Sequence, residues 1–311
     1  MKSRLNVSSS PHIRNSETTT GIMLDVIIAL LPSTVFGIII FGYHAALLVA
    51  VCIASCLFFE FIFAKLFKNE GSIKDLSCVV TGLLIALNLP PRFPLWMAII
   101  GCFAAIVVVK QMFGGLGHNF VNPAIAARII LLISFPKFMT DYVAPFEYSV
   151  DAVSSATPLA ENAGYFSIKE LIFGLHGGSI GETSAVLLSI GGVYLFIRKV
   201  IKPYIPLAFI LSVAVFTFCF TKGDFNLALY AIFSGGVFLS AIFMATDYVT
   251  SPTTTLGQII FAVGCGLLTV IIRSGSAAEG VSFAIIFMNL LVPHIDKLTI
   301  RRPFGWEAKS K

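Results

Sequence analysis

Small and hydroxyl-bearing residues gather between Asp151 and Thr157, where the sequence reads Asp-Ala-Val-Ser-Ser-Ala-Thr and Pro158 follows directly. A threonine hydroxyl is a group that can be modified covalently, and small neighbours leave it open to a modifying enzyme. The same residues are typical of a turn that caps a helix beginning at Pro158. Composition alone favours the turn, and the nearby His176 does not complete the Ser/His/Asp spacing of a hydrolase.

Two further polar stretches lie between apolar segments, at residues 114–124 and 245–255. Their glycines permit close approach of the backbone, and their Asn, His, Thr and Asp side chains supply hydrogen-bonding groups that suit a pocket. Capped turns explain them equally well, because Asn122-Pro123 and Ser251-Pro252 are good helix starts. The candidate contacts to a ligand or an ion are Gly117, His118, Asn119, Asn122, Thr246 and Asp247.

Charged residues also lie within or at the ends of the apolar segments: Asp25, Glu60, Lys110, Arg128 and Asp247. A charge in a bilayer is costly and usually faces the interior of a helix bundle. Asp25 and Lys110 lie near segment ends, where we expect their side chains to extend to the interface. Glu60 and Arg128 lie deeper, so we expect them to pair with each other or with another subunit. Glu60 is the candidate for an ion path.

The composition places these residues in a membrane protein. Of the 311 residues 57% are hydrophobic and only 12% are charged, whereas soluble domains carry about 25% charged residues. Such a chain is expected to contact membrane lipid and not nucleic acid. The first 20 residues are polar, so no cleavable signal peptide is predicted. The six cysteines lie in apolar runs, and we interpret them as core residues rather than metal ligands or disulfide partners.

Long apolar runs predict about ten transmembrane helices, because a bilayer core of about 30 Å requires about 20 apolar residues. Two of the runs, 76–89 and 123–135, are short and touch proline. In transport proteins such segments often mark helices that line a cavity, although an ordinary tilted helix explains them equally. The ten runs are 22–42, 44–65, 76–89, 94–113, 123–135, 181–198, 203–221, 226–246, 255–273 and 277–294.

The distribution of lysine and arginine predicts the orientation of these helices. With ten spans, the termini and the loops on their side hold 15 basic residues, and the opposite loops hold 5. We expect the chain in the cytoplasmic membrane. Because cytoplasmic loops carry the excess of basic residues, both termini are expected in the cytoplasm. The longest loop, 136–182, is then expected on the outer side. Its aromatic residues, among them Tyr142, Phe146, Tyr148, Tyr165 and Phe166, predict that it packs.

A weak internal repeat suggests two related halves. Residues 81–87 resemble 234–240, and each segment is followed by a span with a Gly-Cys pair, at Gly101 and at Gly264. Five spans per half is an odd number, so the halves must be inverted in the membrane. We therefore expect an all-α polytopic membrane protein with two inverted five-helix repeats and one long outer loop. The expected parts are a cytoplasmic segment 1–21, a first repeat 22–135, the loop 136–182, a second repeat 183–294 and a cytoplasmic tail 295–311.

Taken in order, three motifs resemble one known family. The motifs lie at residues 114–124, 151–157 and 243–250, in the same order as in the RnfD family. This family comprises the D subunits of Rnf electron-transport complexes, and it is similar to the B subunit of the sodium-pumping NADH:quinone reductase. The resemblance covers nearly the whole chain, and the number of spans agrees with it. Each motif is weak alone, but their combination is specific.

This resemblance implies a covalently bound flavin. The family motif is Asp-x-x-Ser/Thr-Gly-Ala-Thr, and a flavin transferase joins the phosphate of FMN to its last threonine, which is Thr157 here. Asp151, Ser154 and Ala156 match the motif. Ser155 stands where the family usually has glycine, and it is still a small residue.

The resemblance also implies an activity. Electrons from reduced ferredoxin pass to NAD through the partner proteins of the complex, which are its A, B, C, E and G subunits. The complex exports Na⁺ or H⁺, and the chain itself relays electrons through FMN. The related reductase subunit also holds a non-covalent riboflavin, so a second flavin is expected as a candidate here. Without the resemblance, a stand-alone secondary transporter with inverted repeats explains the spans and charges. It does not explain the match at Asp151–Thr157, and a membrane transferase or hydrolase lacks a visible catalytic set.

Overall fold

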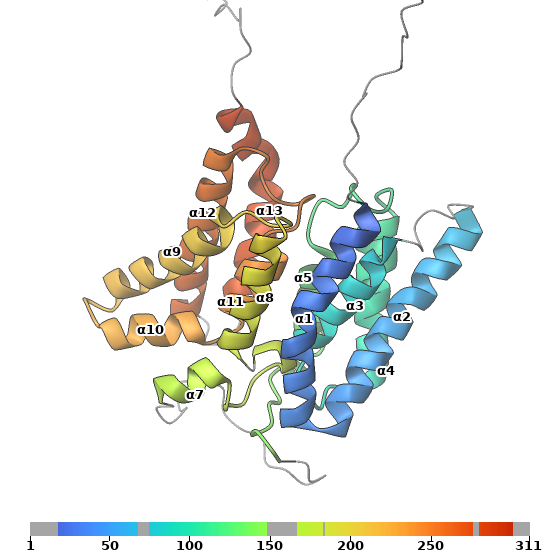
Figure 1. Ribbon diagram of the computed structural model, residues 1–311, viewed down its shortest axis with the longest axis horizontal. Coiled ribbons are helices and arrows are strands. Elements are labelled where there is room, and N and C mark those ends of the chain that lie inside the picture. Colours follow the sequence, from blue (N-terminus) through green and yellow to red (C-terminus); the bar gives the residue numbers. More distant parts are fainter. Residues whose placement is uncertain (1–17, 68–74, 148–166, 183, 276–279, 301–311) are drawn as a thin grey trace, which may run out of the picture.

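The computed structural model of the chain describes residues 18–67, 75–147, 167–182, 184–275 and 280–300, and its regular elements in these ranges are helices (Figure 1). The prediction of an all-α polytopic membrane protein is confirmed. Each of the ten apolar runs contains a helix. Within the described residues four helices are long and apolar enough to cross a membrane, and a bent helix pair makes a fifth.

The first half of the chain contains α1 (Thr19–Phe41), α2 (Tyr43–Phe67), α3 (Ser77–Leu87), α4 (Leu95–Phe103), its π-helical continuation η2 (Ala104–Gln111), and α5 (Pro123–Ser134). The middle contains the short helices α6 (Pro136–Met139), α7 (Ile168–Phe173) and η3 (Ile180–Glu182). The second half contains α8 (Ala185–Ile197), α9 (Tyr204–Phe220), α10 (Phe225–Phe233), α11 (Val237–Leu239), the π-helical η4 (Ser240–Met244), α12 (Thr255–Gly275) and α13 (Gly280–Thr299).

Helices α3 and α5 are as short as the proline-flanked runs predicted, with 11 and 12 residues. The continuous helix predicted for residues 226–246 is wrong. It is broken after α10, and the two parts are bent by 62°. Gly235 and Gly236 adopt positive φ there, at 66° and 67°, a conformation that glycine reaches without a steric penalty. The Arg273 guanidinium group donates to the carbonyl oxygens of Ala231 and Ser234 at 2.8 and 3.0 Å, so it replaces helix hydrogen bonds lost at the break.

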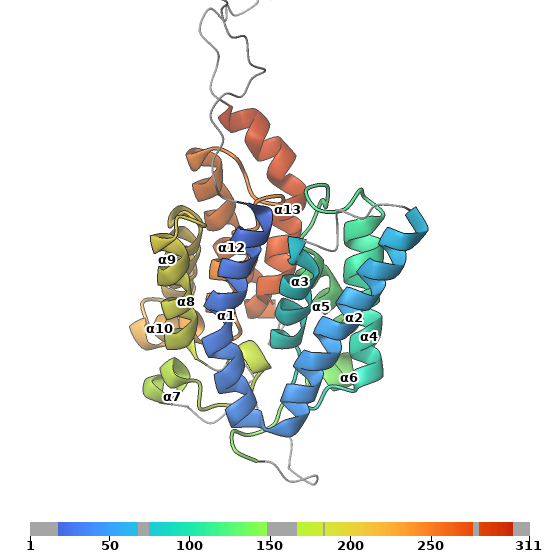
Figure 2. The same cartoon turned by 45° about the vertical axis from the view of Figure 1, so that its right-hand side comes forward.

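The two halves pack in corresponding ways. Helix α2 packs on α3 and α4, and α9 packs on α10 and α12, while α1–α8 and α5–α13 contacts join the halves. Helix α1 begins and α13 ends at one end of the bundle, which we call the terminal side; the opposite end is the loop side (Figures 1 and 2). Asp25, near the start of α1, bonds Arg198, which follows the end of α8, so these two helices are antiparallel. Inverted halves would give this arrangement, but the inverted repeat and its boundaries both stay a prediction.

Apolar side chains cover much of the outer surface of the bundle. Phe58 and Phe61 on α2 and Leu207 and Leu211 on α9 are each more than half exposed. Such a surface would be an aggregation hazard in water, but lipid chains cover it in a bilayer. Five of the six cysteines are buried among apolar residues, as predicted, and Cys219 is exposed instead.

The segment expected as an outer loop does not lie entirely outside the bundle. Its first part is on the loop side, where the N–H of Phe146 donates to the carbonyl oxygen of Ile40 at the end of α1, at 3.0 Å. Residues 176–182 turn inward, and the N–H of Ile180 donates to the carbonyl oxygen of Leu89 at 3.1 Å. A Cβ atom on Gly181 would collide with Leu87 and Leu239, so this segment is packed tightly between the two halves.

Candidate functional site

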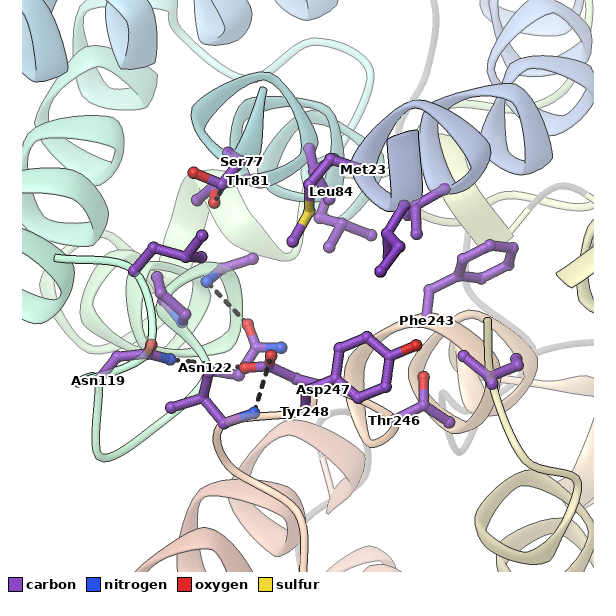
Figure 3. A pocket seen from close by; sticks show the side chains of 18 of the residues that line it. Met23, Ser77, Thr81, Leu84, Asn119, Asn122, Phe243, Thr246, Asp247 and Tyr248 are labelled. Atoms are coloured by element: carbon purple, nitrogen blue, oxygen red, sulfur yellow. Dashed lines mark hydrogen bonds between the residues drawn. The ribbon is translucent and has the colours of Figure 1, made fainter. Parts of the chain in front are cut away.

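A cavity opens on the terminal side between α1, α3, α5, η4 and α8 (Figure 3). It encloses about 810 Å³ of space between atoms, part of it open to solvent. Apolar side chains form most of its walls, and a few amide, hydroxyl and carboxylate groups point into it. The residues that line it include Met23, Val26, Ser77, Val80, Thr81, Leu84, Lys110, Asn119, Asn122, Ile242, Phe243, Thr246, Asp247 and Tyr248.

The two polar stretches singled out in the sequence meet at this cavity. Asn119 and Asn122 come from the loop before α5, and Thr246 and Asp247 come from the loop after η4 (Figure 3). These residues are more than 120 positions apart in the chain, so the tertiary fold brings them together. Gly117 and His118 are exposed and do not belong to the lining.

Asn122 is both a helix cap and a link between the halves. Its Oδ1 accepts hydrogen bonds from the N–H groups of Ala124 and Ile125 at 3.0 and 3.3 Å, and Pro123 occupies the first position of α5. Its Nδ2 donates to the carbonyl oxygen of Met244 at 3.1 Å. The helix start predicted at Asn122-Pro123 is confirmed. The one suggested at Ser251-Pro252 is wrong, because α12 begins at Thr255.

Asp247 lies in the loop between η4 and α12, beside the cavity. Its Oδ1 accepts from the N–H of Val249 at 3.4 Å, and its Oδ2 accepts from Thr250 Oγ1 at 3.1 Å and Asn119 Nδ2 at 3.5 Å. Burial raises the pKa of the Asp247 carboxyl above its ordinary value, and these hydrogen bonds oppose that shift only in part. The side chain can therefore act as a hydrogen-bond acceptor toward a ligand and also as a proton-binding group.

The cavity walls on α1 and α3 could not be found from the sequence. Met23, Val26, Val80 and Leu84 are ordinary residues of apolar runs, and nothing in their types separates them from lipid-facing side chains. Phe243 lies in the π-helical segment η4, and π-bulges are frequent at functional sites. No signal in the sequence predicts that segment.

Glu60, the candidate for an ion path, is completely buried. Its carboxylate accepts from Lys110 Nζ at 2.8 and 2.9 Å and from Gln111 Nε2 at 3.1 Å. The expectation that Lys110 extends to the interface is wrong, because the residue is 2% exposed and its ammonium group pairs with Glu60. The predicted pairing between Glu60 and Arg128 is wrong as well, because Glu60 pairs with Lys110 and Arg128 lies beside Glu182.

Arg128 pairs with groups at the interface of the halves. Its Nη2 lies 3.8 Å from Oε1 of Glu182, and its Nη1 donates to Oδ1 of Asn88 at 2.5 Å. Asp25 is nearly buried and accepts from Tyr194 Oη at 2.8 Å and Arg198 Nε at 3.2 Å. It therefore stays bonded within the bundle instead of extending alone to the interface.

The attachment motif lies outside the described residues. Asp151, Ser154, Ser155, Ala156 and Thr157 all fall in the segment 148–166 that the structure does not describe. Their assignment therefore depends on the sequence alone.

Comparison with known proteins places the chain. The profile of the NQR2, RnfD, RnfE family matches residues 6–305. The chain is 45% identical to the D subunit of the Na(+)-translocating ferredoxin:NAD(+) oxidoreductase complex of Acetobacterium woodii, over 97% of this chain and 95% of that protein. It is 40% identical to the D subunit of the proton-translocating ferredoxin:NAD(+) oxidoreductase complex of Clostridium ljungdahlii, over 98% and 97%. It is 32% identical to the D subunit of the ion-translocating oxidoreductase complex of Salmonella arizonae, over 96% and 98%. The chain belongs to the NQR2, RnfD, RnfE family.

Proposed function

We propose that this chain is the membrane-embedded D subunit of an ion-translocating ferredoxin:NAD⁺ oxidoreductase complex and that it relays electrons within that complex. The observation that carries the proposal is the likeness to two proteins of that name along almost the whole length of each chain. The other members of the complex, the A, B, C, E and G subunits in the Rnf naming, are then its partners. The two relatives are named for different ions, so their names leave Na⁺ and H⁺ both open for this chain.

The proposal includes FMN esterified to Thr157. Three features of the sequence support it: the match of Asp151, Ser154 and Ala156 to the family motif, the small residue at position 155, and the hydroxyl of Thr157 itself. A flavin supplies one- and two-electron chemistry, and the ester fixes its position without changing the ring. A flavin transferase must reach this segment, so the segment must lie outside the membrane-embedded bundle. The outer loop expected from the distribution of basic residues meets this requirement.

The cavity on the terminal side is our candidate for a second, non-covalent flavin. Its mostly apolar walls suit a flat aromatic ring, with Val26, Leu84 and Phe243 among the apolar residues. Its polar groups suit the ring edge and a hydroxylated side chain, since Asn119 and Thr246 supply an amide and a hydroxyl near the Asp247 carboxylate. The wall on η4 belongs to the second half and the wall on α3 to the first, so a ligand here would contact both halves.

A stand-alone secondary transporter is the alternative. The break between α10 and α11 and the buried charged residues favour it, because interrupted helices near a central site are typical of transporters. It leaves the motif at Asp151–Thr157 and the names of the relatives unexplained.

Purification of the tagged chain from its native membrane separates these functions. We expect five further subunits to copurify, together with a flavin that denaturation releases from the cavity. Asn119→Ala combined with Thr246→Val should reduce the released flavin while the copurifying subunits remain. A chain that purifies alone and without flavin would support the transporter and overturn the proposal.

A further inference from the structure

Lys110 uses all three of its hydrogen-bond donors inside the protein. Its Nζ donates to both carboxylate oxygens of Glu60, at 2.8 and 2.9 Å, and to Ser77 Oγ at 2.7 Å. A lysine ammonium group has three N–H donors. Any new anion near Lys110 must therefore displace one of these two partners.

The same lysine borders the cavity. Lys110 and Ser77 both belong to its lining, whereas Glu60 does not. Lys110 thus borders the space proposed to hold a redox group, while its ammonium group pairs with a carboxylate on α2. Lys110 and Gln111, both donors to Glu60, follow each other at the end of the π-helical segment η2.

A polar chain connects this pair to the terminal side. Ser77 Oγ donates to Asp75 Oδ1 at 2.6 Å, and Asp75 is partly exposed. The Cys78 side chain also lies beside Glu60. Glu60 is therefore linked to the terminal side by groups that can assist the entry of a proton or a small cation, although it is itself completely buried.

We propose that Lys110 couples the charge of the cavity to cation binding at Glu60. This inference rests on the proposed function, because it requires a redox group in the cavity. An electron that enters the cavity from a reduced iron–sulfur protein adds one negative charge beside Lys110. The ammonium group moves toward that charge, and Glu60 loses its main partner.

The balance of charge then requires a cation at Glu60. A buried carboxylate that loses its counter-charge is strongly disfavoured, so Glu60, which still accepts a hydrogen bond from Gln111, binds one H⁺ or one Na⁺ from the terminal side. One electron and one cation have entered, and the net charge of the cluster is unchanged. When the electron leaves for the next acceptor, Lys110 returns to Glu60 and displaces the cation. Lys110 acts here as a positioning residue, since it moves between two partners and does not itself carry the ion.

The test measures whether the Glu60 carboxyl is released, independently of turnover. A membrane-permeable carbodiimide reacts with protonated carboxyl groups in apolar surroundings, and peptide mass spectrometry quantifies labelling of Glu60. The purified complex is treated in sodium-free buffer, either oxidised or reduced with dithionite. We expect reduction to increase Glu60 labelling about fivefold or more, which is the lower end of typical coupling between two sites. Lys110→Met should be labelled in both states.

Two control variants make the result specific. Lys65→Met removes an exposed basic residue from the last turn of the helix that carries Glu60, and it should behave like the wild type. Lys110→Arg keeps the charge and should leave Glu60 unlabelled in the oxidised complex. Equal labelling of the oxidised and reduced wild type would overturn the inference, and this comparison requires no variant to fold.

Released flavin, measured on the same samples, separates this inference from the proposed function. A complex that lacks a releasable flavin and shows equal labelling of Glu60 in both redox states would contradict the second flavin and this inference with it, because the inference requires a redox group in the cavity. A complex that retains its flavin while Glu60 stays unlabelled in Lys110→Met would overturn the inference and leave the proposed function intact.

Discussion

The guanidinium group of Arg128 and the carboxylate of Glu182 lie 3.8 Å apart at the interface between the two halves, and both side chains are almost completely buried. Arg128 belongs to α5 of the first half, and Glu182 ends the inward-turning segment that leads into α8. Asn88 accepts a hydrogen bond from the same guanidinium group. This pair therefore fastens the inner end of the 136–182 segment to the membrane-embedded bundle.

Breaking this pair on one side should destabilise the protein. Arg128→Met leaves a buried carboxylate and Glu182→Gln leaves a buried guanidinium group, and loss of one partner of a buried pair costs about 3–5 kcal/mol. The double variant should be more stable than the sum of the single effects predicts. Thermal unfolding of the purified protein in detergent measures this coupling. Strictly additive effects would show that the two groups do not interact.

Asn122 should show separable effects of its two roles. Asn122→Asp keeps an oxygen that caps α5 but loses the amide that donates to Met244. Asn122→Ala loses both, including a cap whose removal costs about 0.5–2 kcal/mol. We expect the alanine variant to unfold at the lower temperature and both variants to weaken retention of a cavity ligand. Equal unfolding temperatures for the wild type and the alanine variant would contradict the capping role.

Asp247 should make the stability depend on pH. Its folded pKa is raised above the ordinary value of 3.8 because of burial, so the folded state binds a proton more readily than the unfolded state. The wild type should therefore lose stability relative to Asp247→Asn as the pH rises from 3.8 through the raised pKa. Above the raised pKa, the difference in stability between the two proteins should be constant. Unfolding temperatures of both proteins, measured from about pH 4 to about pH 7, test this sign. A wild type that gains stability over that range would refute it.

Gly191 should be intolerant of a side chain because α1 and α8 cross there. A Cβ atom on Gly191 would collide with the carbonyl oxygen of Ala29, whereas one on Gly192 would meet the Ile242 side chain at 3.0 Å. A side chain can shift more readily than backbone, so Gly191→Ala should destabilise by about 1–3 kcal/mol and Gly192→Ala by less. The yield and unfolding temperature of the two variants provide the comparison. The reverse order would show that the helices do not approach most closely at Gly191.

The sequence predicted the fold class and a helix in each of the ten apolar runs, because apolar runs and proline positions are local signals, but it did not predict the short helices α6 and α7 within the segment 136–182. It missed the break in the 226–246 run, where Gly235 and Gly236 looked like small residues of a continuous span. The break depends on Arg273, a distant partner along the chain, which replaces the lost hydrogen bonds. A contact between elements of this kind leaves no trace in the periodicity.

The candidate site was predicted only in part, because the sequence shows which residues are polar but not which of them meet in the fold. Asn122 and Asp247 were recognisable because polar residues are rare in this chain, and the structure brings both to one cavity. The partners of the buried charges were predicted wrongly. Glu60 pairs with Lys110 and not with Arg128, since helix packing decides which charges meet and the spacing along the chain does not.

The most direct test of the central claim, an electron-relaying subunit with a covalent flavin, is flavin fluorescence of the denatured protein in a gel. The chain is expressed with a flavin transferase, and wild type, Thr157→Ala and Ser155→Gly are compared. The account predicts a fluorescent band for the wild type and for Ser155→Gly, which restores the usual residue of the family, and a dark band for Thr157→Ala. A fluorescent Thr157→Ala band would place the flavin on another residue. A dark wild type, beside a control protein that the transferase modifies, would contradict the claim that this chain carries a covalent flavin.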